Sequence, residues 1–407
     1  MLLLYNFGIH IYYFIAIIAS NFNAKAKAWV KGRSEQRVAV FKKSIWFHFA
    51  SLGEFEQGRP VLEAVKTQYP GHPVVVSFFS PSGYEIRKNT PLADAVYYLP
   101  LDTPANARAF IKAIDPVAVI FTKYEYWYHY FNQLHQQQIP LYVISAIFRP
   151  KQIFFKWYGG LHRKILSMVT QLFVQDENSR QLLSSIHITK VLVSGDTRFD
   201  RVYTNALQPK SLPVIKEFKS NSPVFIAGST WPADEELLVG LVNQHPNWKF
   251  IFAPHEIPNE KVDKLMALLP ADKTVRFSNI PALQIPLQNY QVLVIDNIGM
   301  LSSLYQYGEI AYIGGGFGVG IHNTLEAAAF GLPVIFGPNY SRFKEAQDLV
   351  ELQGGFSIND SVQLLEAAKQ LMTDDNYRLK ASEVAARYVA KGKGATELIM
   401  KSITIKL

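Results

Sequence analysis

A glycine-rich segment in the C-terminal half carries the residues whose types and spacing have the clearest chemistry. The sequence of residues 314–326 is Gly-Gly-Gly-Phe-Gly-Val-Gly-Ile-His-Asn-Thr-Leu-Glu. An apolar strand is predicted before it, at residues 310–313, and a short helix is predicted to begin near His322 or Asn323. Glycines let backbone N–H groups approach an anion at the N-terminus of a helix. Glu326, one turn into that helix, is placed to accept hydrogen bonds from ribose hydroxyls, so the segment suits a nucleotide that carries a sugar.

The glycine cluster by itself is also compatible with a tight structural loop. Two further features favour a nucleotide site: the His-Asn-Thr-Leu-Glu run, and a Gly-Leu-Pro-Val turn at residues 331–334 that leads into a predicted strand at residues 333–336. Together these elements resemble the donor-binding signature of GT-B glycosyltransferases.

Acidic residues follow two predicted strands of the N-terminal half. Glu54 ends a Ser-Leu-Gly-Glu run after the strand at residues 44–49, and Glu125 lies among aromatic residues after the strand at residues 117–122. A transferase that deprotonates a sugar hydroxyl needs a base within hydrogen-bond reach, and Glu54 is the first candidate and Glu125 the second. The alternatives are a helix-start acid at Glu54 and core aromatics around Glu125. A Ser-Pro-Ser-Gly run at residues 80–83 either holds polar substrate groups or caps a helix.

Predicted strands and helices alternate along the chain, which indicates parallel sheets. In the first half the predicted strands are residues 44–49, 74–79, 117–122, 141–145, 172–174 and 190–193, with helices at residues 59–68, 103–113, 131–137 and 178–185. In the second half the predicted strands are residues 224–227, 249–253, 291–295, 310–313 and 333–336. The predicted fold class is α/β, with two Rossmann-like domains facing a cleft and ligands beyond the carboxyl ends of the strands.

The length of 407 residues also favours two domains. A Pro-containing stretch at residues 205–223 interrupts the alternation, and we expect the boundary near residues 205–215. The predicted organisation is a membrane anchor at residues 1–24, an acceptor-side domain at residues 25–208 and a donor-binding domain at residues 209–407.

Composition narrows the classes of partner and chemistry. The net charge of +8 favours anionic partners, but the basic residues are spread along the chain. The sequence has no helix-turn-helix, no RNP aromatic signature and no concentrated basic stripe, so no nucleic-acid partner is expected. The absence of cysteine excludes disulfides, thiolate catalysis and thiolate metal sites.

The N-terminus has a different composition from the rest of the chain. Residues 2–20 are apolar and aromatic without Asp, Glu, Lys or Arg. The basic residues that follow are Lys25, Lys27, Lys31, Arg33, Arg37, Lys42 and Lys43. Because a cleaved signal peptide carries its charge before the apolar run, we expect a membrane anchor with everything after Ala24 on the cytoplasmic side. The alternative is a buried or interfacial helix, since the apolar stretch is short for a span.

Seven runs of residues, in order along nearly the whole chain, resemble one family, the bacterial 3-deoxy-D-manno-octulosonic acid (Kdo) transferases of lipopolysaccharide synthesis. The runs are residues 51–54, 80–83, 99–102, 125–127, 195–200, 227–230 and 322–326. The resemblance implies a GT-B fold and inverting transfer of Kdo from CMP-Kdo to the lipid A precursor, lipid IVA, at the cytoplasmic face of the bacterial inner membrane. It implies no cofactor and no metal in the glycosyl step.

The resemblance also assigns roles to individual residues. Glu54 matches the general base, and Glu125 matches a second acidic position that orients donor or acceptor. The donor-binding positions that it implies are Pro254, His255, Gly299, Met300, Leu301, Asn323, Thr324, Leu325 and Glu326. Ser229 and Thr230, which follow a predicted strand, and Gly316 of the glycine loop are added from their positions; Ser229 and Thr230 also suit a helix N-cap.

Two donor positions depart from the family pattern. His255 stands where an arginine is expected, and it titrates near neutral pH; Met300 stands where a glutamate is expected. Backbone amides of the glycine loop are the expected replacement for the lost phosphate partner. Two other classes therefore stay open: another GT-B enzyme, such as a UDP-sugar transferase or epimerase, and a nucleotide-binding membrane protein without activity.

Overall fold

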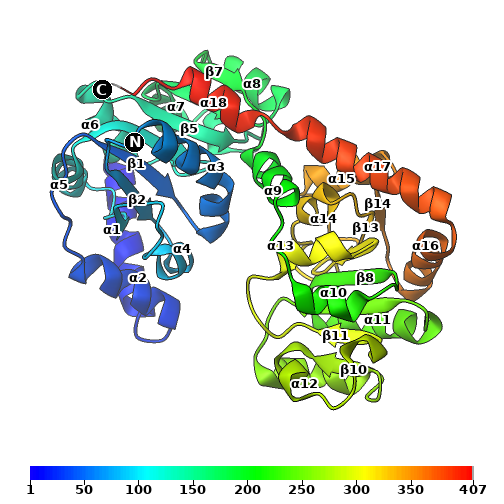
Figure 1. Cartoon of the computed structure of the whole chain (residues 1–407). Coiled ribbons are helices and arrows are strands. Elements are labelled where there is room, and N and C mark those ends of the chain that lie inside the picture. The colour runs from blue at the N-terminus through cyan, green and yellow to red at the C-terminus, as the bar shows by residue number, and fades with distance from the viewer. Residues whose placement is uncertain (406–407) are drawn as a thin grey trace. The chain divides into compact units, whose positions relative to one another are not determined.

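The computed structural model describes residues 1–405 and divides into two compact units (Figure 1). The first unit is Met1–Arg201 together with a C-terminal segment that begins at Gly392, and the second is Val202–Lys391. Within the described residues each unit contains a parallel sheet of seven strands. The predicted α/β class with two parallel, Rossmann-like sheets is confirmed.

The first sheet has the strand order β3-β2-β1-β4-β5-β6-β7. Its strands are β1 (Ser44–Phe49), β2 (Val74–Phe78), β3 (Ala95–Tyr98), β4 (Pro116–Thr122), β5 (Leu141–Ala146), β6 (Gln171–Val174) and β7 (Val191–Val193). Most of these strands are buried on both faces, as their continuous apolar runs require. The strand order reverses between β1 and β4, which are hydrogen-bonded neighbours. In open α/β sheets such a reversal is where ligands bind.

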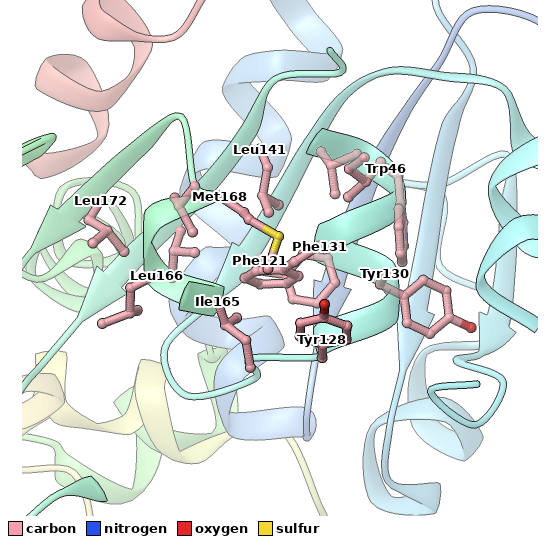
Figure 2. Close-up of a cluster of buried hydrophobic side chains, with 14 of the residues drawn as sticks. Trp46, Phe121, Tyr128, Tyr130, Phe131, Leu141, Ile165, Leu166, Met168 and Leu172 are labelled. Atoms are coloured by element: carbon pink, nitrogen blue, oxygen red, sulfur yellow. The ribbon is translucent and has the colours of Figure 1, made fainter. Parts of the chain in front are cut away.

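Helices cover both faces of this sheet. They are α3 (Leu52–Gln68), α4 (Pro81–Arg87), α5 (Pro104–Ile114), α6 (Tyr128–Gln136), α7 (Gly160–Ser167), α8 (Glu177–Ser184) and α18 (Ala395–Ser402), with a short 3-10 helix η1 (Ile153–Phe155). On one face Trp46 and Phe121 of the sheet pack against Phe131 of α6 and Ile165 of α7 (Figure 2). On the other face α3 and α18 pack on the sheet, and Ile399 of α18 is fully buried there.

Two helices precede the first sheet. Helix α1 (Leu2–Ala19) is long and apolar enough to cross a membrane by length and composition, and none of its residues is buried. It is nevertheless tied to the first unit, because Tyr5 Oη donates to Asp102 (2.5 Å) and Asn6 Oδ1 accepts from His129 Nε2 (2.7 Å). The Leu-Pro-Leu-Asp run that ends at Asp102 therefore has a structural role.

Helix α2 (Ala24–Glu35) is capped by Asn23 and carries part of the basic segment. Its Arg33 points inward: the guanidinium lies 3.8 Å from the ring centroid of Trp29 and donates to the carbonyls of Leu99 and Phe79. Arg33 thus holds α2 on the sheet and does not belong to an exposed basic surface.

The second sheet has the strand order β10-β11-β9-β8-β12-β13-β14 and reverses between β8 and β12. Its strands are β8 (Val224–Thr230), β9 (Lys249–Pro254), β10 (Thr274–Arg276), β11 (Val292–Val294), β12 (Ile310–Ile313), β13 (Val334–Phe336) and β14 (Gly355–Ser357). The α-helices of this half are α9 (Thr197–Leu207), α10 (Pro213–Lys219), α11 (Pro232–Gln244), α12 (Asn259–Leu268), α13 (Leu301–Leu304), α14 (Leu325–Ala329), α15 (Lys344–Glu351), α16 (Ser361–Thr373) and α17 (Asp375–Gly392). Short 3-10 helices are η2 (Phe277–Ala282), η3 (Leu287–Asn289) and η4 (Tyr305–Tyr307).

The C-terminal segment differs from the expected domain ranges. The units divide after Arg201 and not near residues 205–215, and the stretch expected to be irregular forms α9 and α10. The chain returns to the first unit at Gly392, because Asp200 accepts hydrogen bonds from the backbone N–H groups of Gly394 (2.5 Å) and Thr396 (2.7 Å). Residues 395–405 then complete the first core, so the range 209–407 expected for the donor domain is too long.

Candidate functional site

Both candidate acids of the first unit lie where its strand order reverses. Glu54 follows β1 and Glu125 follows β4, and these two strands are paired side by side. Parallel strands bring their carboxyl ends to the same edge of the sheet. The charge of Glu125 contributes to the raised pKa of Glu54, as this placement leads us to expect.

Glu54 is both a helix-capping residue and a buried acid. Ser51 is the N-cap of α3 and accepts from the N–H of Glu54, and Glu54 Oε2 accepts a hydrogen bond from the backbone N–H of Ala50, the residue before the cap, at 2.7 Å. Only 9% of the residue is exposed. Burial raises the pKa of Glu54 to about 7; the charge of Glu125 adds to the rise, while the Ala50 N–H and the charge of Lys123 oppose it. A carboxyl group with that pKa is about half ionised near neutral pH, and a general base is most effective when its pKa lies near the working pH.

Glu125 is fixed by a chain of side-chain hydrogen bonds. Its Oε2 accepts from Trp127 Nε1 (2.8 Å) and lies 3.4 Å from His48 Nε2. His48 Nδ1 lies 2.8 Å from Ser77 Oγ, which accepts in turn from Trp46 Nε1 (2.7 Å). Burial lowers the pKa of His48, so its ring is neutral. The chain is satisfied when the Ser77 hydroxyl donates to Nδ1 and Nε2–H points to Glu125.

The Gly-Asp-Thr-Arg-Phe-Asp run at residues 195–200 is hydrogen-bonded to α3 through Gln57. Asp196 accepts from Gln57 Nε2 (2.7 Å) and from Arg198 Nε (2.8 Å). Burial alone would raise the pKa of Asp196, but the charge and hydrogen bonds of Arg198 outweigh it and hold the pKa below its usual value. Ser80 caps α4 by accepting from Ser82 N–H, so the Ser-Pro-Ser-Gly run is a helix cap.

In the second unit the predicted donor residues gather at the reversal between β8 and β12. Ser229 adopts a left-handed backbone conformation (φ 54°) where the pairing of β8 with β9 shifts register. Thr230 Oγ1 donates to Glu235 (2.9 Å), and its carbonyl accepts from the N–H of His255. Pro254 pairs with Thr230 at the end of β9. Four of the predicted positions therefore form one continuous stretch of this edge.

Three aromatic rings form a stack at the same edge. The rings of Trp231 and His255 lie 4.9 Å apart and those of His255 and His322 lie 4.3 Å apart, and Trp231 Nε1 donates to His322 Nε2 (3.1 Å). Burial lowers the pKa of His255, assisted by the charge of Lys261. Burial, with the charge of His255, lowers the pKa of His322 to about 4. Both imidazoles are consequently neutral at pH 7.

The glycine loop is required by close backbone packing. A Cβ on Gly314 would lie 2.2 Å from the carbonyl oxygen of Ser229, and one on Gly316 would lie 2.6 Å from Gly337 Cα. Gly315 has φ 92°, and its N–H donates to Asp234 (2.9 Å). Close backbone packing therefore requires glycine at these positions after β12. This structural requirement is compatible with a role in binding.

Helix α14 begins later than predicted. Its first residue is Leu325, which is buried, with Thr324 as N-cap. Asn323 ends the preceding loop: its Oδ1 accepts from the N–H of Leu325 (3.1 Å), and its Nδ2 donates to Glu326 Oε1 (3.1 Å). The Asn323 side chain thereby accepts from the N–H of Leu325, which has no partner within the helix because Leu325 is its first residue. Glu326 lies in the first turn of α14, where its Oε1 is held by the Asn323 amide.

The loop after β11 reaches the same edge. Gly299 has φ 94°, Met300 is the N-cap of the short α13, and Leu301 approaches Gly228 at the end of β8. Nearby, burial and the charge of Glu326 raise the pKa of Tyr305 well above its usual value. The structure therefore brings these predicted positions together with the β8 edge.

The chain resembles known proteins over most of its length. Residues 23–201 match the family model of 3-deoxy-D-manno-octulosonic-acid transferase (kdotransferase). The 3-deoxy-D-manno-octulosonic acid transferase of Haemophilus influenzae is 27% identical over 88% of this chain and 86% of its own length, and that of Aquifex aeolicus is 25% identical over 86% and 93%. The chain is therefore similar to Kdo transferases over most of its length.

Solved structures show the same fold at lower sequence identity. The UDP-GlcNAc 2-epimerase of Neisseria meningitidis, bound to UDP-GlcNAc, superposes with a TM-score of 0.63 at 16% identity, covering 88% of this chain and 98% of that one. A glycosyltransferase of Rickettsia africae superposes with a TM-score of 0.56 at 13% identity, covering 88% and 97%. These likenesses confirm the predicted GT-B-like architecture of the chain.

Several residues of the two edges were not predicted from the sequence. His48 and Trp127 hold Glu125, and Trp231 and His322 hold His255. His48 is hidden in sequence because it alternates with core residues of β1. His322 was visible as part of the His-Asn-Thr-Leu-Glu run, but only the fold shows that it stacks on His255.

Proposed function

We propose that this protein is a Kdo transferase that transfers Kdo from CMP-Kdo to the lipid A precursor, lipid IVA, with inversion at the anomeric carbon. The observation that carries the proposal is Glu54: a buried carboxylate at the reversal point of the first sheet, with a pKa of about 7. The similarity to Kdo transferases supports Kdo as the transferred sugar. The proposal assigns acceptor and base to the first unit and the nucleotide to the second.

The proposed glycosyl transfer requires a proton acceptor for the attacking hydroxyl and groups that stabilise the leaving CMP. Glu54 removes the proton of the acceptor hydroxyl as that oxygen attacks the anomeric carbon of Kdo. The bond between this carbon and the phosphate oxygen breaks, and CMP leaves with the electron pair. Burial is the main cause of the raised pKa of Glu54, and Glu125, fixed by Trp127 and His48, acts as a positioning group whose charge adds to the rise.

The second unit supplies groups that suit CMP. Glu326 and the amide of Asn323 are proposed to bind the ribose, since both are polar side chains at the start of α14. Because the imidazoles of His255 and His322 are neutral, the phosphate is assigned to N–H donors at the glycine loop and at the imidazoles. Further proposed donor positions at this edge are Ser229 and Thr230 at the end of β8, Gly299 and Met300 before α13, and Leu301, the first residue of α13.

A membrane location on the cytoplasmic side of the bacterial inner membrane fits the lipid acceptor. The outward face of α1 is apolar, with Leu3 84% and Phe14 63% exposed. Exposed lysines of α2 next to it, such as Lys25, would add an attraction of about 1 kcal/mol each to an anionic leaflet.

Removal of residues 1–22 should move the protein from the membrane fraction into the soluble fraction while leaving CMP binding intact, because the proposed donor site lies in the second unit. Sedimentation of membranes with immunodetection measures the first effect and titration calorimetry the second. Undiminished membrane recovery of the truncated chain would contradict the anchor.

The decisive experiment is product analysis with defined substrates. Purified enzyme, CMP-Kdo and lipid IVA should give a product heavier by one or more Kdo residues, measured by mass spectrometry. Glu54→Gln should abolish it, whereas Glu63→Gln, a more exposed glutamate on the same helix, should not. Turnover of a UDP-sugar without reaction of CMP-Kdo would favour the epimerase-like alternative, and binding of CMP without turnover would favour a protein that has lost activity.

A further inference from the structure

Two cavities of the first unit share one wall, the side chain of Trp127. The first, of about 300 Å³, is lined almost entirely by apolar groups, with Ile9 and Tyr12 of α1 facing Phe79, Leu99 and Leu101. The second, of about 330 Å³, is lined by polar and aromatic groups that include Glu125, Tyr126, Gln152 and His162. An apolar and a polar cavity thus meet at the indole that donates to Glu125.

Helix α1 closes the apolar cavity from outside. Its hydrogen bonds from Tyr5 to Asp102 and from His129 to Asn6 set its rotation, and this rotation turns Ile9 toward the unit. The opposite face of the helix carries exposed apolar residues such as Phe7 and Ile15. The cavity therefore lies directly under a helix whose outer surface suits lipid.

Two of the residues that line the polar cavity, Tyr126 and His162, also carry buried polar atoms. Within residues 1–405, Tyr126 Oη and His162 Nδ1 are buried and have no hydrogen-bond partner. Burial lowers the pKa of His162, so this imidazole is neutral. Buried polar atoms without partners are costly, and they are commonly satisfied by a ligand or by ordered water. The polar side chains that line the cavity, such as Glu125 and Gln152, suit a hydroxylated headgroup.

We propose that the two cavities together bind one amphiphile, the lipid acceptor, with an acyl chain under α1 and the sugar headgroup beside Glu125. This inference rests on the proposed function, which supplies the lipid-borne acceptor. Three observations favour an acyl chain as occupant: the apolar lining, the exposed apolar face of the covering helix, and the shared wall with the polar cavity. Helix α1 is then part of the acceptor site as well as an anchor.

Filling the apolar cavity from the helix provides the test. Ile9→Trp places a large ring in the cavity, and Ile15→Trp, on the exposed part of the same helix, is the matched control. Loss of burial for as few as two methylene groups corresponds to about a tenfold change in affinity. Ile9→Trp should therefore raise KM for tetra-acylated lipid IVA about tenfold. KM for a deacylated acceptor, and the affinity for CMP, should stay within twofold of the wild-type values.

The outcomes separate this inference from the proposed function. Equal kinetics of Ile9→Trp and Ile15→Trp, or an equal rise in KM for both acceptors, would overturn the acyl-chain site. Absence of Kdo transfer by the wild-type enzyme would instead overturn the proposed function.

A second measurement needs neither turnover nor a variant. Lipid IVA with a photoactivatable acyl chain should crosslink the full-length wild-type protein at Phe79, Leu99 or Leu101, mapped by peptide mass spectrometry. Crosslinks confined to the outer face of α1, at residues such as Phe7 and Ile15, would show that the chain stays in the bilayer and would overturn the inference.

Discussion

Substitution of Glu54 by Gln should increase stability at the same time as it abolishes transfer. Burial holds the pKa of this carboxyl at about 7 against an ordinary value of 4.5. A rise of that size corresponds to about 3 kcal/mol of differential stabilisation of the protonated form in the folded state. Glutamine keeps the geometry, because its amide oxygen can accept the N–H of Ala50, and it carries no charge.

The sign of the effect sets the pH at which it is visible. The unfolded chain releases the Glu54 proton near pH 4.5 and the folded chain near pH 7, so between these values the folded state binds more protons and stability falls as pH rises. Above pH 7 the full cost of burying the charge is present. The advantage of Glu54→Gln over wild type should therefore be near zero below pH 4.5 and about 3 kcal/mol above pH 7.

Thermal unfolding of the purified protein in detergent, at pH 4.5 and pH 8, measures this difference. For a unit of this size, about 3 kcal/mol corresponds to a midpoint higher by roughly 6 to 12 °C at pH 8. Glu63→Gln serves as the control on the same helix. Equal midpoints for Glu54→Gln and wild type at pH 8 would show that ionised Glu54 does not destabilise the fold. Near-normal turnover of the variant would show that Glu54 is not the general base. In wild type, kcat/KM should rise with pH through about 7 as Glu54 loses its proton.

Three further substitutions test separate parts of the structure. Glu125→Gln should shift the acidic limb of the kcat/KM profile to lower pH, because the charge of Glu125 contributes to the raised pKa of Glu54; an unchanged limb would contradict their contact. Glu326→Ala should weaken CMP binding about tenfold by titration calorimetry, and an unchanged affinity would remove Glu326 from the ribose site. Asp200→Ala removes the acceptor of the Gly394 and Thr396 N–H groups and should destabilise the first unit by about 2 to 4 kcal/mol, with faster hydrogen exchange in α18; protection equal to wild type would contradict the docking role.

The sequence predicted the strands that carry chemistry better than those at the sheet margins. β1 and β12 have the predicted limits, because each is a continuous buried apolar run beside a glycine or serine turn. β3, β10 and β14 were missed, since they are edge or near-edge strands of three or four residues with little pattern of their own. The motifs after the central strands were sufficient to place the candidate residues at the edges where the strand orders reverse.

Long-range contacts were not predictable from local pattern. The hydrogen bond between His48 and Ser77 joins two strands whose sequences are typical of a hydrophobic core, so neither residue stands out in the sequence. The return of the chain at Gly392 depends on one carboxylate, Asp200, nearly two hundred residues earlier. The docking of α1 through Tyr5 likewise depends on a distant partner, Asp102, whereas hydropathy reports only that the helix is apolar.

The two sheet edges differ in the kind of group that each one buries. The first edge holds a carboxylate, Glu54, whose charge changes near neutral pH, next to a second carboxylate that is locked by hydrogen bonds. The second holds imidazoles, His255 and His322, that remain neutral at that pH, together with backbone N–H groups. Proton removal requires a group of the first kind, because it must alternate between two charge states. Binding of a phosphate that is already anionic requires only donors, so neutral rings at His255 and His322 are compatible with a working nucleotide site.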